Sequence, residues 1–146
     1  MKTYTIKLRP NLSELESLFT WLETIPLPQY VAPQPVALIC EEVFCNIVTH
    51  AYDSFSDPLN RDIEVRIYFS DEMFVLKFSD FGLPFTSGEN KEKLSSQSLE
   101  DRPLGGVGWP LIRHFSDEVQ YQTRNDNNIL TIKKLNQGVK HGNNHE

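Results

Sequence analysis

Three polar side chains, Glu42, Asn46 and His50, recur at every fourth position of a stretch that is otherwise almost wholly apolar. If residues 36–52 form a helix, these positions drift by only about 80° in total, so the side chains share one line. Burying a carboxylate and an amide without partners costs free energy, so this line is expected to face a wet cavity or a ligand. The alternative is that the line is the exposed side of an amphipathic helix.

The chemistry of this line suits phosphoryl transfer. The amide oxygen of Asn46 is a neutral hard ligand for Mg²⁺, which proteins usually hold through one or two side chains, with phosphate oxygens and water completing the shell. Glu42, one turn away, can accept a proton from a hydroxyl or water that attacks a γ-phosphate. We therefore predict a magnesium ligand at Asn46 and a general base at Glu42.

Two glycine-bearing turns follow along the chain. In the segment SDFGLPF at 79–85, Asp80 can accept a hydrogen bond from an exocyclic amine such as that of adenine, and Gly82 lets the backbone approach the ring. The segment Gly105-Gly106-Val107-Gly108 opens a predicted helix, where free backbone amides and the helix dipole favour phosphate. The alternatives are a plain β-turn for the first segment and a flexible hinge for the second.

Other nucleotide-binding signatures are absent from the sequence. Asp80-Phe81-Gly82 spells the metal-binding motif of protein kinases, but the chain has no VAIK-like lysine after a glycine-rich loop and no HRD loop. No glycine is followed by Lys and Ser or Thr, which excludes a Walker A loop.

Composition limits the partners and the compartment. The 146 residues include 14 Lys and Arg against 20 Asp and Glu, a net charge of -6, and no basic stripe, so we expect no nucleic-acid partner. No apolar run is long enough to span a bilayer and the start does not read as a signal peptide, so we expect a cytoplasmic protein without membrane contact. Cys40 and Cys45 lie about 140° apart on the predicted helix and are expected to be small core residues, not a disulfide.

The pattern of apolar residues predicts an α+β fold of one domain, residues 1–135, followed by a polar tail, 136–146. Alternation predicts strands at 2–8, 63–69, 74–78, 119–123 and 129–135, and a period of 3.6 residues predicts helices at 13–25, 36–52 and 109–115. The residues Asn125, Asp126, Asn127 and Asn128 are expected to form the last hairpin turn. The polar segment 86–103 is expected to be a lid or mobile loop. Because hairpins join the later strands, we expect a two-layer α/β sandwich with helices on one face of a mostly antiparallel sheet.

Taken together, three motifs resemble the N, G1 and G2 boxes of the GHKL ATPase superfamily, and most closely those of bacterial anti-sigma factor serine/threonine-protein kinases. These motifs are Glu42-x-x-x-Asn46-x-x-x-His50, Asp80-x-Gly82-x-Pro84-Phe85, and Gly105-Gly106-Val107-Gly108 with Leu111 and Ile112. The resemblance implies the Bergerat fold and ATP and Mg²⁺ as cofactors. It also implies phosphorylation of a STAS-domain anti-anti-sigma partner, with a sigma factor as a second candidate partner. Relatives commonly form homodimers, so a homodimer is an option.

Residue by residue, the resemblance implies Glu42 as catalytic base, Asn46 as magnesium ligand and Asp80 as the adenine-reading carboxylate. Gly82 and Pro84 would then lie beside the adenine ring, and residues 105–108 would wrap the triphosphate. Thr131 matches a threonine near the adenine pocket of relatives, and His50 matches the N-box histidine without an assigned role.

The sequence also departs from the family pattern at several positions. Proline at 84 suits the anti-sigma branch better than the histidine-kinase branch, where glycine is usual. Trp109 stands where a smaller residue is common, so it could narrow the lid or contact a partner. No lysine adjoins the glycines of 105–108, which leaves Arg102 as the candidate for a phosphate contact.

Two other functions compete with a protein kinase. In one, ATP only orders the lid so that the domain captures a regulator without chemistry. The other is the catalytic domain of a two-component histidine kinase, which is disfavoured because no helical segment precedes the first predicted strand.

Overall fold

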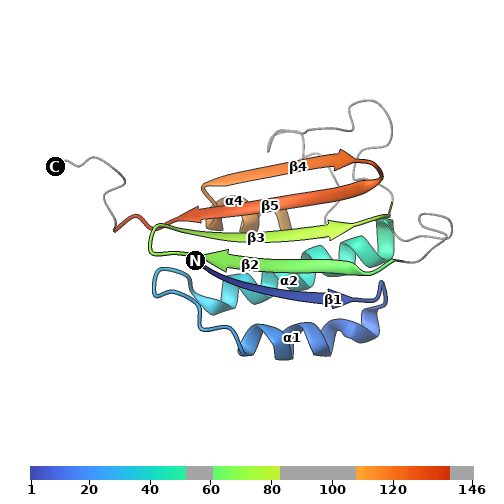
Figure 1. Ribbon diagram of the computed structural model, residues 1–146, viewed down its shortest axis with the longest axis horizontal. Helices are drawn as coiled ribbons and strands as arrows, with labels where there is room; N and C mark the ends of the chain where they lie inside the picture. Colours follow the sequence, from blue (N-terminus) through green and yellow to red (C-terminus); the bar gives the residue numbers. More distant parts are fainter. Residues whose placement is uncertain (52–60, 83–107, 139–146) are drawn as a thin grey trace.

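The computed structural model describes residues 1–51, 61–82 and 108–138, which form a five-stranded antiparallel sheet with helices packed on one face (Figure 1). The strand order is β1-β2-β3-β5-β4. The strands are β1 (Lys2–Leu8), β2 (Ile63–Phe69), β3 (Met73–Asp80), β4 (Glu118–Arg124) and β5 (Asn127–Leu135). Within the described residues every neighbouring pair is antiparallel, and the pairs β2–β3 and β4–β5, which are consecutive in the chain, form hairpins.

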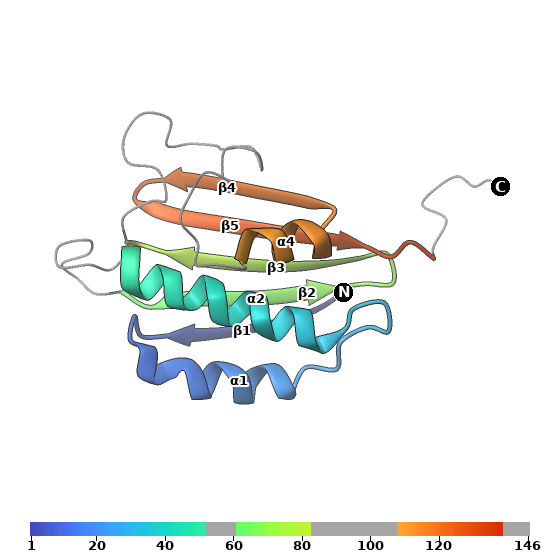
Figure 2. The ribbon, with the colours of Figure 1, turned by 180° about the vertical axis from the view of Figure 1, so that it is seen from behind.

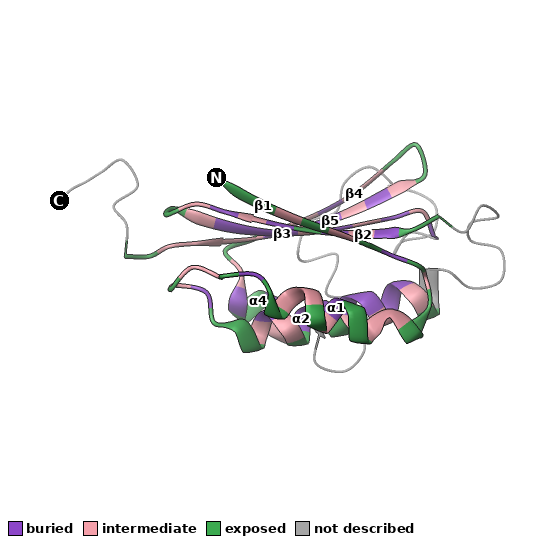
Figure 3. Cartoon of the chain, turned by 60° about the horizontal axis from the view of Figure 1, so that its bottom comes forward, coloured by how far each residue is buried: buried purple, intermediate pink, exposed green. Residues whose placement is uncertain are grey.

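The helices all cover the same face of the sheet, and the other face has no helix from the described part of the chain (Figure 3). They are α1 (Leu15–Glu23), preceded by the 3₁₀ turn η1 (Leu12–Glu14), then α2 (Pro33–Asn46), and α4 (Gly108–Phe115). The two-layer α/β sandwich predicted from the sequence is therefore confirmed.

The core lies between the two layers. Along α2 the buried residues Val36, Ile39, Cys40, Val43 and Phe44 recur at intervals of three and four, so one stripe of the helix faces the sheet. Every second residue of β2, from Ile63 to Phe69, is buried. Leu38, on the outer side of α2, is 46% exposed.

Among the boundaries that differ from the predicted ones, two affect the site. The α-helical part of α2 ends at Asn46, and the chain continues as the π-helical turn η2 (Ile47–Ala51). The last hairpin turns at Asn125 and Asp126, whose φ angles are 54° and 67°, so the Asn127 and Asn128 predicted for the turn belong to β5 instead. Two residues with positive φ suffice for a tight hairpin.

Candidate functional site

The last turn of α2 joins Glu42 to Asn46. The Nδ2 group of Asn46 donates to the backbone carbonyl oxygen of Glu42 at 2.8 Å and to Glu42 Oε2 at 3.0 Å. Two acceptors on the same side fix the orientation of the amide, because only its nitrogen end can donate. The predicted line is therefore present for these two residues, with the carboxylate held against the amide.

The third member of the line, His50, has a different geometry. From Ile47 the chain is π-helical, with more residues per turn than an α-helix. The rotation of 100° per residue used to align His50 with Asn46 does not apply across this turn. The side chain of His50 lies outside the described residues. A single π-helical turn is often found beside functional sites.

The amide oxygen of Asn46 is left for a ligand. Asn46 is only 5% exposed, and its Oδ1 is buried without a hydrogen-bond partner in the described structure. An unpaired buried acceptor is costly, so it calls for a donor or a cation. A hard oxygen of this kind fits Mg²⁺. The described residues contain no cluster of three His, Cys, Asp or Glu side chains able to hold a metal.

A second polar cluster lies at the end of β3. Asp80 is 4% exposed, and its Oδ1 accepts from the backbone N–H of Gly82 and from Asn128 Nδ2, both at 2.9 Å. The same Nδ2 donates to the carbonyl oxygen of Gly82 at 2.8 Å, while Asn128 Oδ1 accepts from Thr123 Oγ1 at 2.8 Å. Strands β4 and β5 thus hold both the carboxylate and the glycine turn that the sequence predicted for adenine.

Burial raises the pKa of Asp80 to about 6, although the hydrogen bonds from Asn128 and Gly82 act in the opposite direction. Desolvation wins because the carboxylate has left water almost completely. A buried carboxylate with a perturbed pKa is typical of a binding site.

Asn128 was missed by the sequence analysis, which assigned it to a turn. Asn128 is only 1% exposed, and it is buried like Leu130 and Ile132 on the same face of β5. A polar residue in phase with buried strand positions is a signal that could have identified it.

The two clusters lie at the same end of the sandwich. Figures 1 and 2 both show the C-terminal end of α2 beside the end of β3 at which Asp80 lies. Asp80 is in phase with the buried residues Leu76 and Phe78, so it faces the helix layer. Asp80, the glycine turn and the C-terminal end of α2 therefore lie at the same end of the sandwich.

Thr131, predicted to lie near the adenine pocket, does not join the cluster around Asp80. It pairs with Lys77 on β3 and with Gln120 on β4, three positions after Asn128. An odd offset along a strand puts a side chain on the opposite face of the sheet. Asn128 takes the place by Asp80 instead.

The remaining predicted residues are only partly described. Pro84, Gly105, Gly106 and Val107 lie outside the described residues, as do the predicted lid at 86–103 and Arg102. Gly108 is the first residue of α4, which packs beside α2 (Figure 2). Trp109 is 7% exposed and belongs to the core, so a partner contact through its ring is not supported.

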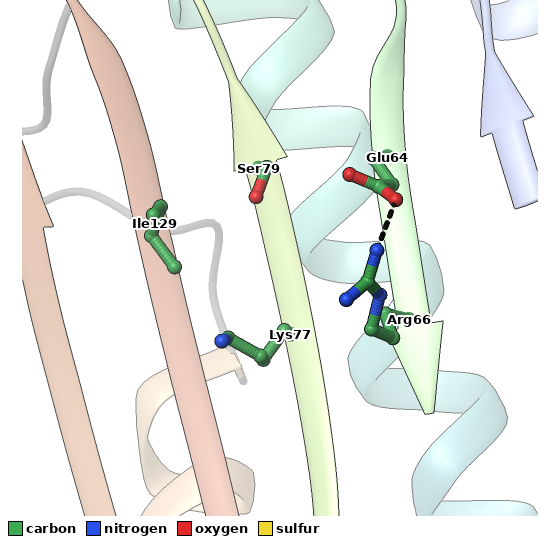
Figure 4. Close-up of a pocket in the computed structure, with 5 residues that line it drawn as sticks. All are labelled: Glu64, Arg66, Lys77, Ser79 and Ile129. Atoms are coloured by element: carbon green, nitrogen blue, oxygen red, sulfur yellow. Dashed lines mark hydrogen bonds and ion pairs between the residues drawn. The ribbon is translucent and has the colours of Figure 1, made fainter. Parts of the chain in front are cut away.

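A cavity on the open face of the sheet is separate from this site. It has a volume of about 200 Å³ and is lined by Glu64, Arg66, Lys77, Ser79 and Ile129 (Figure 4). Arg66 and Glu64 form an ion pair of 2.9 Å within it. Since its strand residues alternate with the buried ones, the cavity lies on the face opposite Asp80.

Sequence comparisons agree with this arrangement. Residues 14–134 match the family described as the histidine kinase-like ATPase domain, and the chain belongs to that family. An ATPase domain of this kind binds ATP.

The chain is also 28% identical over 134 residues to the serine/threonine-protein kinase BtrW of Bordetella bronchiseptica. The match covers 90% of this chain and 92% of that protein. The resemblance to the GHKL superfamily is thereby confirmed, and kinase-like use of ATP is supported. Among the described helices, none has the length and apolar character needed to cross a membrane.

Proposed function

We propose that this protein is an ATP-dependent protein-serine kinase that phosphorylates a STAS-domain anti-anti-sigma protein. The observation that carries the proposal is the hydrogen-bonded pair of Glu42 and Asn46, in which a carboxylate lies beside a buried amide oxygen without a partner. The name of the relative, a serine/threonine-protein kinase, supports the same class of reaction.

In the proposed reaction Glu42 takes the proton of the attacking serine hydroxyl. The serine oxygen forms a bond to the γ-phosphorus, the bond from that phosphorus to the β–γ bridging oxygen breaks, and ADP leaves with the electron pair. Asn46 would hold Mg²⁺ through Oδ1, and the bound ion would neutralise charge on the phosphate oxygens. Asp80 would accept a hydrogen bond from the adenine amine, and Gly82 would allow the ring to lie against the backbone.

The same site can serve a binding module in which ATP lets the domain capture a sigma factor or another regulator without transfer. What favours transfer is Glu42, because a module that only binds has no use for a carboxylate held beside the metal ligand. Phosphotransfer depends on the Glu42 side chain and capture of a regulator does not, so a substitution of Glu42 distinguishes the two functions.

The experiment combines the purified protein, Mg-ATP labelled at the γ-phosphate and a STAS-domain protein encoded by the same genome. Glu42→Gln is expected to bind ATP within about twofold of wild type and to lose transfer by about 10²-fold to 10⁴-fold, because it lacks the base. Glu41→Gln is the matched control, since Glu41 is exposed and lies about 100° around the helix from Glu42.

Wild-type protein that binds ATP but forms no phosphoserine would overturn the kinase proposal. Capture of a sigma factor that needs ATP yet tolerates Glu42→Gln would then favour the binding module.

A further inference from the structure

An apolar groove runs between the end of α1 and the start of α2, in the helix layer. Its walls are Phe19 and Leu22 of α1, Leu27 of the connection, and Pro33, Val36 and Ala37 of α2, around a volume of about 200 Å³. A neighbouring hollow of about 480 Å³ shares Leu22, Leu27 and Pro33 with it. We call these two hollows together the α1–α2 groove. The two helices lie side by side in Figure 2.

The rim of the groove carries negative charge. Glu23 lines both hollows and is exposed. From Pro10 to Thr49 the chain has five carboxylates, Glu14, Glu16, Glu23, Glu41 and Glu42, and no Lys or Arg. This segment contains the whole of α1 and α2, and its five carboxylates account for most of the net charge of -6.

The lysine and arginine side chains of the described residues lie mainly on the strands. Seven belong to strands and three do not: the strand residues are Lys2, Lys7, Arg66, Lys77, Arg124, Lys133 and Lys134, and the others are Arg9, Arg61 and Arg113. The two layers therefore differ in sign of charge at their surfaces. An electrostatic potential of one sign over an apolar groove selects partners that carry the opposite charge.

We propose that the α1–α2 groove is a docking site for a basic amphipathic helix of a partner protein. A third helix can lay an apolar stripe between two others, and Lys or Arg beside that stripe would meet Glu16, Glu23 and Glu41. The exposed Leu38, about 100° around α2 from Ala37, extends the apolar surface toward the Glu42 side of the helix. The docking site is separate from the nucleotide site and does not depend on the proposed kinase activity.

Charge argues against two other occupants. A second copy related by a two-fold axis through the groove would bring its own acidic α1 and α2 against this rim, and like charges repel. An anionic membrane surface would be repelled in the same way. A basic helix is the occupant whose charge complements the rim.

The test measures fluorescence anisotropy of two synthetic peptides, each of about four helical turns with the same stripe of leucines. One carries lysines beside the stripe and the other carries glutamates at the same positions. The full-length chain, without nucleotide, is expected to bind the lysine peptide and not the glutamate peptide. Glu23→Lys is expected to weaken the lysine peptide by about fivefold and to tighten the glutamate peptide, as exposed charge pairs do.

The matched control is Glu118→Lys, the same change of charge on β4, which lies at the edge of the sheet opposite β1. It is expected to leave both peptides unchanged. Leu22→Ala should weaken the lysine peptide, and thermal unfolding of each variant separates lost docking from lost folding.

Equal binding of the two peptides, or a Glu23→Lys variant that binds both as wild type does, would overturn the proposal. A change in molecular mass by light scattering in Glu23→Lys or Leu22→Ala would identify a second copy as the occupant and would also overturn it. Since the assay contains no ATP, its outcome is independent of phosphotransfer.

Discussion

Asn128 reaches across from β5 to the end of β3, where its Nδ2 lies 2.9 Å from Asp80 Oδ1 and 2.8 Å from the carbonyl oxygen of Gly82. A single side chain thus binds both the carboxylate and the turn that follows it. Thr123 donates to the Oδ1 of Asn128, which fixes the direction of the amide. Among the described residues both donors to Asp80 use Oδ1, so its second oxygen is the one that a ligand amine would meet.

Asn128→Ala is therefore expected to weaken ATP binding by about tenfold, because it leaves the buried carbonyl of Gly82 unpaired and Asp80 less firmly held. The preference for adenine over guanine nucleotides should fall as well, which a purely structural role would not cause. Titration with fluorescent ATP and GTP analogues measures both. Thr131→Ala, on the opposite face of the same strand, should leave affinity and preference unchanged; equal losses in the two variants would contradict this role.

The contrast between Asn128 and Thr131 shows what the sequence could and could not predict. Apolar periodicity sufficed for the sandwich, because burial of one face is a property of each segment by itself. Asn128 was assigned to the turn since four consecutive polar residues give no sign of where a strand begins. Only the pairing of β5 with β3 brings it to Asp80, and such pairing depends on residues far apart in the chain.

The end of α2 was also only partly predictable from the sequence. The spacing of Glu42 and Asn46 predicted a shared face, and their hydrogen bond agrees with that geometry. The extension to His50 assumed a uniform helix. The π-helical turn η2 after Asn46 could not be predicted from apolar spacing. The residues of this turn are compatible with an α-helix as well as with a π-helix.

Binding of adenosine is expected to weaken as the pH falls below about 6, the value to which burial raises the pKa of Asp80. Protonation removes the negative charge that accepts the hydrogen bond of the amine. Adenosine is the suitable ligand because it has no phosphate groups that titrate in this range. Calorimetry between pH 5 and pH 8 gives the profile. Asp80→Asn should bind weakly at every pH, and a wild-type affinity that does not change with pH would rule out this role for the carboxylate.

The same raised pKa predicts how the nucleotide-free protein is stabilised. The folded state holds the proton of Asp80 more tightly than the unfolded state, so this contribution to stability is complete below about pH 4 and is lost as the pH rises through about 6. At neutral pH the buried charge costs on the order of 2 kcal/mol. Asp80→Asn removes that charge and is expected to raise the free energy of unfolding at pH 7.5 by about 1 kcal/mol, measured with urea.

At pH 4.5 the difference between Asp80→Asn and wild type should nearly vanish. A variant that is less stable than wild type at pH 7.5 would mean that the carboxylate contributes more through its hydrogen bonds than it costs through desolvation. In that event the perturbed pKa would no longer support a binding role for Asp80.

The two cysteines are expected to differ in reactivity. Cys40 is fully buried and burial raises the pKa of its thiol. Burial also raises the pKa of Cys45, with smaller contributions from the carboxylates of Glu41 and Glu42, but this residue is partly exposed. Iodoacetamide should label Cys45 slowly in the native protein and Cys40 only after unfolding, because the thiolate is the reactive form. Peptide mass spectrometry reads both sites, and rapid native labelling of Cys40 would contradict the packing of α2.

The oxygen of Asn46 leads to the most direct test of the metal site. If Oδ1 holds Mg²⁺, adding the ion should tighten ATP binding in wild type and have little effect in Asn46→Ala. The affinity for adenosine should stay within about twofold, because the proposed adenine contact is made by Asp80. Asn46→Asp tests the role of Oδ1 separately from that of Nδ2. It keeps an oxygen for the metal but loses the donor that binds Glu42, and it places a second negative charge 3.0 Å or so from that carboxylate.

Asn46→Asp is therefore expected to retain the magnesium dependence of ATP binding and to lose phosphotransfer. The variant lacks the Nδ2 donor that orients Glu42 and places a like charge against it. Isothermal titration with and without Mg²⁺ measures the first property, and the γ-phosphate assay measures the second. If Mg²⁺ tightens ATP binding by the same factor in Asn46→Ala as in wild type, the unpaired oxygen serves another donor, and the ion is held by other residues.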